Sequence, residues 1–214
     1  MPTAGTVKED AVNQLNKKVS GIVDTTILFQ QYNRARRDHS GEYAWRGLGA
    51  HSTLTFALDA PTGLYLAPLP ADLDRGFDPH VYQVSAMGPT DLDPADFADL
   101  FTPGQKRRYV DFAGSQVWST VTGAARIDYQ KLLADLPINT SQDSTVEPFA
   151  SVTALTLRLI AYYWLAAERD RDEYDAAMQE YAGELSTEIE QEVSKAGKVL
   201  PNGKEARYKA LGRY

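Results

Sequence analysis

Residues 143–163, DSTVEPFASVTALTLRLIAYY, mark the point at which the chain returns from a strand-like pattern to a helical one. Capping side chains, an acidic residue and Pro148 follow one another in the order that favours a helix start. The apolar residues after Pro148 recur every three or four positions and form one face: Phe149, Val152, Leu155, Leu159, Ile160 and Tyr163. This pattern predicts a helix that begins near Pro148.

A second helix is predicted after the charged run ERDRDE, residues 168–173. Within that run Asp170 and Glu173 have the spacing of a capping box. The apolar side of this helix is formed by Tyr174, Ala177, Met178, Tyr181, Leu185, Ile189 and Val193. The pattern fades at Ala196-Gly197, so we assign residues 138–197 to a C-terminal helix pair.

The N-terminal region, residues 1–42, shows the same helical period. Its apolar residues are Val12, Leu15, Val19, Ile22, Val23, Ile27 and Leu28. They predict one helix from Val12 to about Arg37, capped by Asp10 and weakened by about 1 kcal/mol at Gly21. The basic residues Arg34, Arg36 and Arg37 stand at its expected end, where they interact favourably with the helix dipole or contact a partner.

Residues 43–137 show a period of two, which is typical of β-strands. Alternating runs occur at residues 54–58, 81–84, 109–112, 117–121 and 125–129, and the short turns DAPTG, AGSQ and VTGA separate several of them. Residues 87–104 are acidic and interrupted by proline, and we interpret them as a loop with one short helical turn. The pattern predicts an antiparallel β insertion, folded either as a small β-sandwich or as a barrel-like sheet.

The expected fold class is therefore α+β. It is a helical bundle, made of the N-terminal helix and the C-terminal helix pair, with a large antiparallel β insertion and an extended C-terminal arm, residues 198–214.

Few residues point to catalysis. The 214 residues contain no cysteine, and His39, His51 and His80 lack the spacing of a metal motif. The acidic residues Asp91, Asp93, Asp96 and Asp99 could suggest a calcium loop or an acid/base pair. A calcium loop, however, requires glycine and glutamate where Asp96 and Thr102 stand. We assign no catalytic, cofactor-binding or metal-binding residue, and a carboxylate-dependent hydrolase built on this acidic cluster is kept as an alternative.

Charge and hydropathy limit the classes of molecule that we expect this protein to bind. The formal net charge is −7, and the stretch from Asp59 to Asp99 has eight aspartates against the single base Arg75, which disfavours phosphate. We therefore expect no sequence-specific nucleic-acid binding. No apolar run approaches the roughly 18 residues that cross a bilayer, so no membrane association is expected.

The stretch GLYLAPLPADL, residues 63–73, contains an aromatic residue followed by Leu-Pro-x-Asp. The residues of this pattern are Tyr65, Leu69, Pro70 and Asp72, with Trp45 upstream. Together with residues 125–129 and the helix entry at Pro148, it resembles the head–tail connector, or adaptor, proteins of the neck of tailed bacteriophages. The resemblance covers roughly residues 12–195.

This resemblance implies a structural, non-enzymatic virion protein without cofactors. About twelve copies would form a ring beneath the portal protein, line part of the DNA channel and meet a tail or nozzle protein. Assembly would take place in the host cytoplasm. Another non-enzymatic virion component, such as a capsid-stabilising or tail-completion protein, is the alternative. Part of the acidic set, either Asp59–Asp99 or Glu184, Glu188, Glu190 and Glu192, is expected to face the channel or the solvent.

The arm carries five basic residues against one acidic residue in an otherwise acidic chain. Fully extended, it would reach about 55 Å. The resemblance implies that such an arm docks on the portal. The residues expected to bind there are Lys204, Arg207, Tyr208, Lys209, Leu211, Arg213 and Tyr214.

Overall fold

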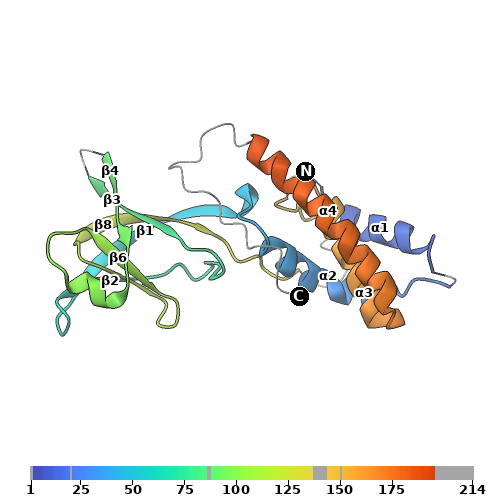
Figure 1. The fold of residues 1–214 in the computed structure, drawn as a ribbon, viewed down its shortest axis with the longest axis horizontal. Coiled ribbons are helices and arrows are strands. Elements are labelled where there is room, and N and C mark those ends of the chain that lie inside the picture. Colours follow the sequence, from blue (N-terminus) through green and yellow to red (C-terminus); the bar gives the residue numbers. More distant parts are fainter. Residues whose placement is uncertain (1, 20, 86–87, 137–143, 150, 196–214) are drawn as a thin grey trace. The chain divides into compact units, whose positions relative to one another are not determined.

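The computed structural model describes residues 2–19, 21–85, 88–136, 144–149 and 151–195 (Figure 1). The chain divides into two compact units. The helical unit comprises Met1–Leu48 and Leu133–Tyr214, and the barrel unit comprises Gly49–Leu132. Each unit has a hydrophobic core of its own.

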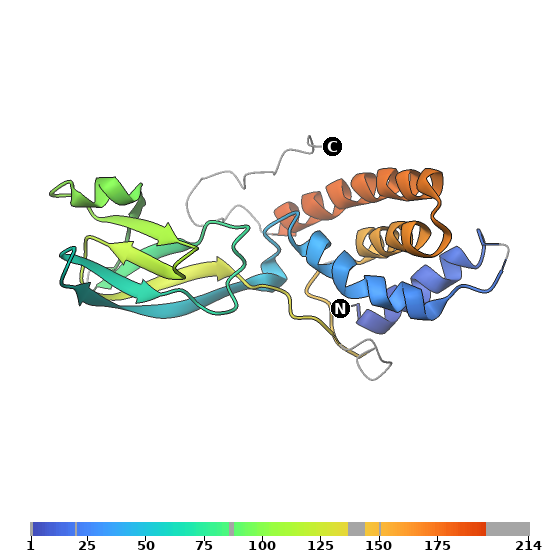
Figure 2. The same ribbon diagram turned by 90° about the horizontal axis from the view of Figure 1, so that it is seen from below.

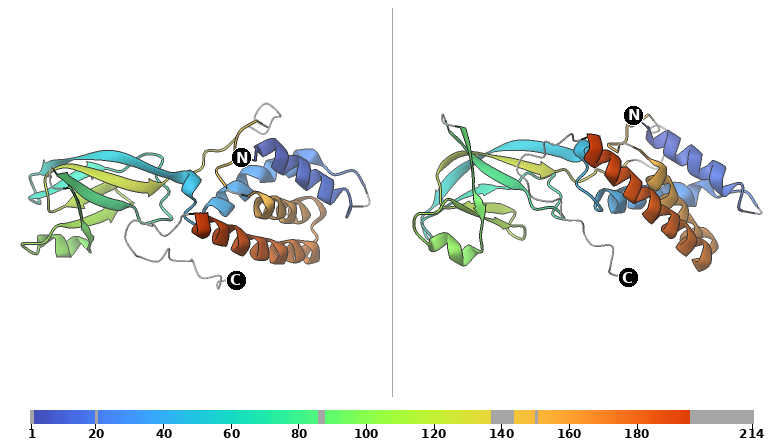
Figure 3. Two further views of the ribbon diagram at one scale, coloured as in Figure 1. Left: turned by 90° about the horizontal axis from the view of Figure 1, so that it is seen from above. Right: turned by 45° about the horizontal axis from the view of Figure 1, so that its top comes forward.

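Four α-helices are present in the described part of the helical unit: α1 (Ala4–Leu15), α2 (Thr25–Ser40), α3 (Thr153–Tyr163) and α4 (Arg171–Lys195). Helix α3 contacts the other three helices. It lies between α4 on one side and α1 and α2 on the other (Figures 2 and 3). All its residues from Ala154 to Tyr163 are buried, as expected for a helix that is packed on every side.

The N-terminal region forms two helices, so the single predicted helix is wrong. Helix α2 begins at Thr25 because the Asp24 carboxylate accepts hydrogen bonds from the backbone N–H groups of Thr26 and Ile27. The predicted cap Asp10 lies inside α1, whose N-cap is Thr3. Residues of the intervening turn also pack on the core, so the apolar period continues across the break.

Helix α3 begins at Thr153 and not near Pro148. The segment before it is extended and pairs with the N-terminus. The backbone N–H of Ala4 donates to the Thr145 carbonyl at 2.8 Å, and that of Glu147 donates to the Pro2 carbonyl at 2.9 Å. The residues predicted to cap a helix near Pro148 therefore pair with the N-terminal residues 2–4 and do not start a helix.

The helical unit also has a 3₁₀ turn, η1 (Arg46–Leu48), and a π-helical turn, η4 (Trp164–Glu168), which ends α3. One half of the capping box predicted between Asp170 and Glu173 is present: the Glu173 N–H donates to the Asp170 carboxylate at 3.0 Å, whereas the Asp170 N–H donates to the Trp164 carbonyl at 3.1 Å. No helix in the described ranges combines the length and the apolar character needed to cross a bilayer.

The barrel unit is one eight-stranded sheet within the described residues, in the order β4-β3-β8-β1-β2-β7-β6-β5. The strands are β1 (Gly49–Asp59), β2 (Leu64–Pro68), β3 (His80–Ser85), β4 (Gly88–Asp91), β5 (Asp93–Pro94), β6 (Arg107–Asp111), β7 (Gln116–Ser119) and β8 (Gly123–Gln130). A 3₁₀ helix, η2 (Phe97–Phe101), follows β5.

The first and last strands of this order are consecutive in the chain. At Leu92 the chain changes partner: the Leu92 N–H donates to the Val81 carbonyl at 3.1 Å, and the Asp93 N–H donates to the Lys106 carbonyl at 3.0 Å. The sheet is thereby nearly closed into a barrel. Pairing of β5 with β6 is parallel and the other ladders are antiparallel, so the sheet is mixed.

The predicted fold class, a helical bundle with an antiparallel β insertion, is therefore wrong. The structure has four helices and a large, nearly closed mixed sheet within the described residues. Much of the error comes from residues 87–104, interpreted as a loop, which contain β4 and β5. These strands are short and rich in Asp and Pro, residues depleted in strands, so the sequence pattern does not reveal them. The predicted arm lies outside the described residues.

Candidate functional site

The helical unit contains a hydrogen-bonded group of polar side chains in its core, which we call the Arg158 network. From α3, Arg158 donates through Nη1 to the Tyr181 hydroxyl at 2.6 Å and to the Glu42 carboxylate at 2.9 Å. Its Nε donates to the Tyr162 hydroxyl at 3.3 Å. That hydroxyl in turn donates to the Asp38 carboxylate on α2. The network joins α2, α3 and α4 around one cation.

Glu188 on α4 connects this network to the start of α3. Its Oε1 accepts a hydrogen bond from the Ala154 backbone N–H at 3.2 Å, where α3 lacks a cap of its own. Its Oε2 lies 3.4 Å from Nε2 of His39, and Nδ1 of His39 lies 3.3 Å from the Tyr181 hydroxyl. The His39 ring also stacks on Trp45.

Burial sets the protonation of these groups. It lowers the pKa of His39 below its usual value, although the adjacent Glu188 acts in the opposite direction. Burial raises the pKa of Tyr181, against the effect of Arg158. For Arg158 itself, burial would lower the pKa, but the surrounding tyrosines and Glu42 raise it. The network therefore favours a neutral imidazole and neutral phenols around a permanently charged guanidinium.

A second buried ion pair lies between α2 and the segment before α3. Nε of Arg36 lies 3.0 Å from the Glu147 carboxylate, which also accepts a hydrogen bond from the Tyr32 hydroxyl at 2.6 Å. Nη1 of Arg36 donates to the Ala134 carbonyl at 2.9 Å. The interpretation of Glu147 as an acidic residue at a helix start is therefore wrong: its carboxylate neutralises Arg36 inside the core.

Both groups join elements of the helical unit to one another. His39 and Glu147 are fully buried, so a molecule in solution cannot contact them. A buried polar network that is largely satisfied fixes one arrangement of its surroundings, because any other arrangement leaves a charge without a partner. The helices of this unit are held by directional bonds as well as by apolar packing.

Two of the residues that carry the resemblance to phage connector proteins, Trp45 and Pro148, lie in the helical unit. Trp45 is fully buried and donates from its indole N–H to the His39 carbonyl at 3.1 Å. The Pro148 backbone packs against Gly47 so closely that a Cβ at Gly47 would lie 2.0 Å from the Pro148 carbonyl oxygen. This close approach explains a glycine two residues after Trp45.

The other four, Tyr65, Leu69, Pro70 and Asp72, lie in the barrel unit. Tyr65 and Leu69 pack against its core, and the Pro70 carbonyl accepts a hydrogen bond from the Leu73 N–H. The Asp72 carboxylate accepts a hydrogen bond from the Tyr129 hydroxyl at 2.8 Å. Partial burial and this bond raise the pKa of Tyr129 to about 12. The Leu-Pro-x-Asp pattern is therefore a turn fastened to the end of β8.

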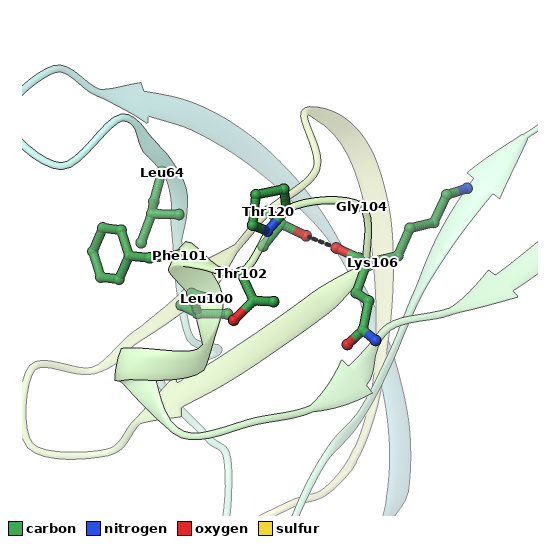
Figure 4. A pocket seen from close by; sticks show the side chains of 9 residues that line it. Leu64, Leu100, Phe101, Thr102, Gly104, Lys106 and Thr120 are labelled. Atoms are coloured by element: carbon green, nitrogen blue, oxygen red, sulfur yellow. Dashed lines mark hydrogen bonds between the residues drawn. The ribbon is translucent and has the colours of Figure 1, made fainter.

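The barrel unit has a hollow of about 340 Å³ beside η2 (Figure 4). Figure 4 shows Leu64 and Phe101 at one side of it and Lys106 at the other, and the Thr120 hydroxyl donates to the Gln105 carbonyl at 2.8 Å. The hollow lies next to an outer cluster of aromatic rings, in which Phe97 packs edge-on against Phe101, Tyr109 and Trp118. No buried charge lines it, so its chemistry assigns no ligand.

The four aspartates of the acidic cluster are exposed. Asp91 lies 3.2 Å from Nε2 of His80, and the backbone N–H of Asp99 donates to the Asp96 carbonyl. Across the residues that the structure describes, no three His, Asp or Glu side chains are grouped so as to hold a metal ion.

The acidic residues of α4 do not share one face. Glu184 and Glu190 are exposed, whereas Glu188 and Glu192 are buried. Glu188 and Glu192 therefore belong to the buried side of α4, and the expectation that part of the acidic set faces a channel stays a prediction. The spacing contained the signal: Glu188 and Glu192 follow Tyr181 and Leu185 at intervals of three and four, and so lie on the apolar side of the helix.

The residues predicted to bind the portal lie outside the described residues. They are Lys204, Arg207, Tyr208, Lys209, Leu211, Arg213 and Tyr214.

No protein-family model matches this chain, and a search of curated proteins also finds no match.

Proposed function

We propose that this protein is a head–tail connector of a tailed bacteriophage. About twelve copies form a ring beneath the portal, and the ring joins the capsid to the tail and lines part of the DNA channel. The protein acts as a structural component and needs no cofactor. Its place is the neck of the virion, and its assembly takes place in the host cytoplasm.

One observation carries the proposal: Asp72 and Tyr129, two residues of the resemblance that are far apart in the sequence, contact one another. Asp72 of the Leu-Pro-x-Asp turn accepts a hydrogen bond from Tyr129, in the strand that completes the pattern. Pro148, which ends the pattern, packs against Gly47, two residues beyond Trp45. The first contact lies within the barrel unit and the second within the helical unit, and each supports the proposal for the unit that contains it.

The interior of the helical unit suits a protein that must resist mechanical force. A connector has to keep its shape while DNA and tail proteins act on it. The Arg158 network and the Arg36–Glu147 pair join helices through buried, charge-assisted bonds, which resist rearrangement more strongly than apolar packing alone.

The barrel unit is inserted through neighbouring strands. Gly49, at the start of β1, is paired with Gln130, at the end of β8, so the chain enters and leaves the barrel side by side. Such an insertion can carry a separate binding surface without altering the unit that bears it. In our proposal this surface meets a tail or nozzle protein.

The C-terminal arm is the proposed contact with the portal. A single exposed ion pair contributes only about 0–1 kcal/mol, so the basic residues of one arm bind weakly. In a ring every arm is presented at once, and each docked arm raises the effective concentration of the others. Lys204, Arg207, Lys209 and Arg213 would pair with acidic portal residues, while Tyr208, Leu211 and Tyr214 would supply apolar contacts.

Truncation after Gly197 tests this function. The full chain and the truncated chain are each mixed with the portal protein encoded in the same genome, and bound protein is measured by co-sedimentation. We expect the truncated chain to keep its helical circular dichroism spectrum and to lose portal binding. Equal binding by both chains would contradict the role of the arm, and absence of binding by the full chain would contradict the connector function.

A further inference from the structure

The turn between α1 and α2 exposes an apolar side chain completely. Ile22 is 97% exposed, whereas its neighbour Val23 is buried and Val19 is partly buried against the core. Val19 and Val23 therefore anchor the chain before and after Ile22, whose side chain is directed outward. Lys17 and Lys18 in the same turn are also exposed. We call Lys17, Lys18 and Ile22 the basic turn.

The outer face of α4 has the opposite charge. Its exposed acidic residues include Asp172, Glu180 and Glu190, and between them stand the exposed small residues Ala176 and Gly183. Angular spacing along the helix places these five residues on the side away from the buried Tyr181 and Leu185. We call them the acidic face. At Gly183 no other group lies within 4 Å of where a Cβ would be, so the backbone itself is open to contact.

These two surfaces belong to different sides of the helical unit. Helix α4 packs on α3, and α1 and α2, which the basic turn connects, lie on the other side of α3 (Figures 2 and 3). Two complementary surfaces on different sides of one unit suit a head-to-tail contact between copies. A contact of this kind generates a ring when the rotation between copies closes.

We propose that the basic turn of one copy docks on the acidic face of a second copy. Ile22 covers the small residues Ala176 and Gly183, while Lys17 and Lys18 face the carboxylates of Glu180 and Glu190. The inference rests on the proposed function, because it names the contact that would build the ring. It assigns the acidic face to the contact between subunits and not to the DNA channel.

Cysteine cross-linking tests the contact directly, because the chain has no cysteine of its own. The variants Ile22→Cys and Gly183→Cys are made separately and together, and are oxidised at high protein concentration. We expect neither single variant to cross-link efficiently, their mixture to give a linked dimer, and the double variant to give a ladder beyond the dimer. The pair Ile22→Cys and Val84→Cys is the control, since Val84 is 56% exposed but lies in the barrel unit.

Charge reversal supplies an independent readout. Lys17→Glu with Lys18→Glu, or Glu180→Lys with Glu190→Lys, should each weaken assembly about tenfold or more, because like charges then meet at the contact. Mixing the two reversed proteins should restore assembly of alternating copies. Lys106→Glu with Arg107→Glu makes the same change of charge on the barrel unit and should assemble like the unmodified chain.

The outcomes separate this inference from the function on which it rests. Rings on the portal without cross-linking, and with no effect of charge reversal, would overturn the contact and leave the connector function standing. Cross-linking together with restored assembly, but without portal binding, would support the contact and overturn the connector function. Absence of both cross-linking and assembly would overturn the two together.

Discussion

At the scale of single residues, Gly47 has no room for a side chain. A Cβ there would lie 2.0 Å from the Pro148 carbonyl oxygen, which is backbone and cannot rotate away. We expect Gly47→Ala to destabilise the protein by about 1–3 kcal/mol. Gly21→Ala is the matched control: nothing lies within 4 Å of its Cβ position, so that variant should be neutral or slightly stabilised. Urea unfolding measures both, and equal midpoints for the two variants would contradict this account.

The Arg36–Glu147 pair is the second residue-scale test. Arg36→Met leaves the fully buried Glu147 carboxylate without its cation, and breaking such a pair typically costs about 3–5 kcal/mol. Replacing both partners, Arg36→Met with Glu147→Leu, removes the isolated charge and should recover part of that loss. A double variant less stable than Arg36→Met alone would show that the ion pair is not the source of the effect.

His39 should make stability depend on pH. Its pKa is lowered in the folded state, mainly by burial, so below about pH 6.5 the unfolded chain binds a proton more readily than the folded one. The unmodified protein should therefore lose stability as the pH falls below that value, by at most about 1.4 kcal/mol per pH unit from this group.

The variant His39→Gln removes this contribution but leaves the carboxylates unchanged. Its melting temperature should fall less between pH 7.5 and pH 5.5 than that of the unmodified protein, even though it starts lower because contacts to Tyr181 and Glu188 are weakened. Parallel decreases in the two proteins would exclude His39 as the source.

At the scale of elements, the two units should be separable. The barrel is entered and left through the paired residues Gly49 and Gln130, which places the two chain ends about 5 Å apart. Replacing residues 49–132 by a short glycine–serine linker should therefore preserve the helical circular dichroism signal and cooperative thermal unfolding. A collapse of the helical signal would show that the two units depend on one core.

Patterns formed by residues close together in the sequence correctly predicted the positions of several strands and one helix cap. Each of the five alternating runs overlaps a strand, β1, β3, β6, β7 or β8, and the Asp170–Glu173 capping interaction is present. Such signals depend on neighbours in the chain. The break at Asp24 was missed because an apolar period records which side is buried and not whether the helix is continuous.

The sequence patterns could not predict which side chains contact one another across long stretches of the chain. The contact of His39 with Tyr181 spans 142 residues, and that of Arg36 with Glu147 spans 111. A single sequence shows that a polar residue lies on an apolar side, as Glu188 does, but not which group neutralises it. The closure of the sheet at Leu92 was missed for the same reason, since it depends on two separate strands at once.

At the scale of the whole molecule, the proposed connector function requires this chain to be a subunit of a ring. Cryo-electron microscopy of the protein mixed with the portal encoded in the same genome measures that property most directly. We expect a closed ring of about twelve copies attached to one face of the portal around an open channel. Portal particles without added density, with the protein remaining monomeric at saturating concentration, would contradict the connector function.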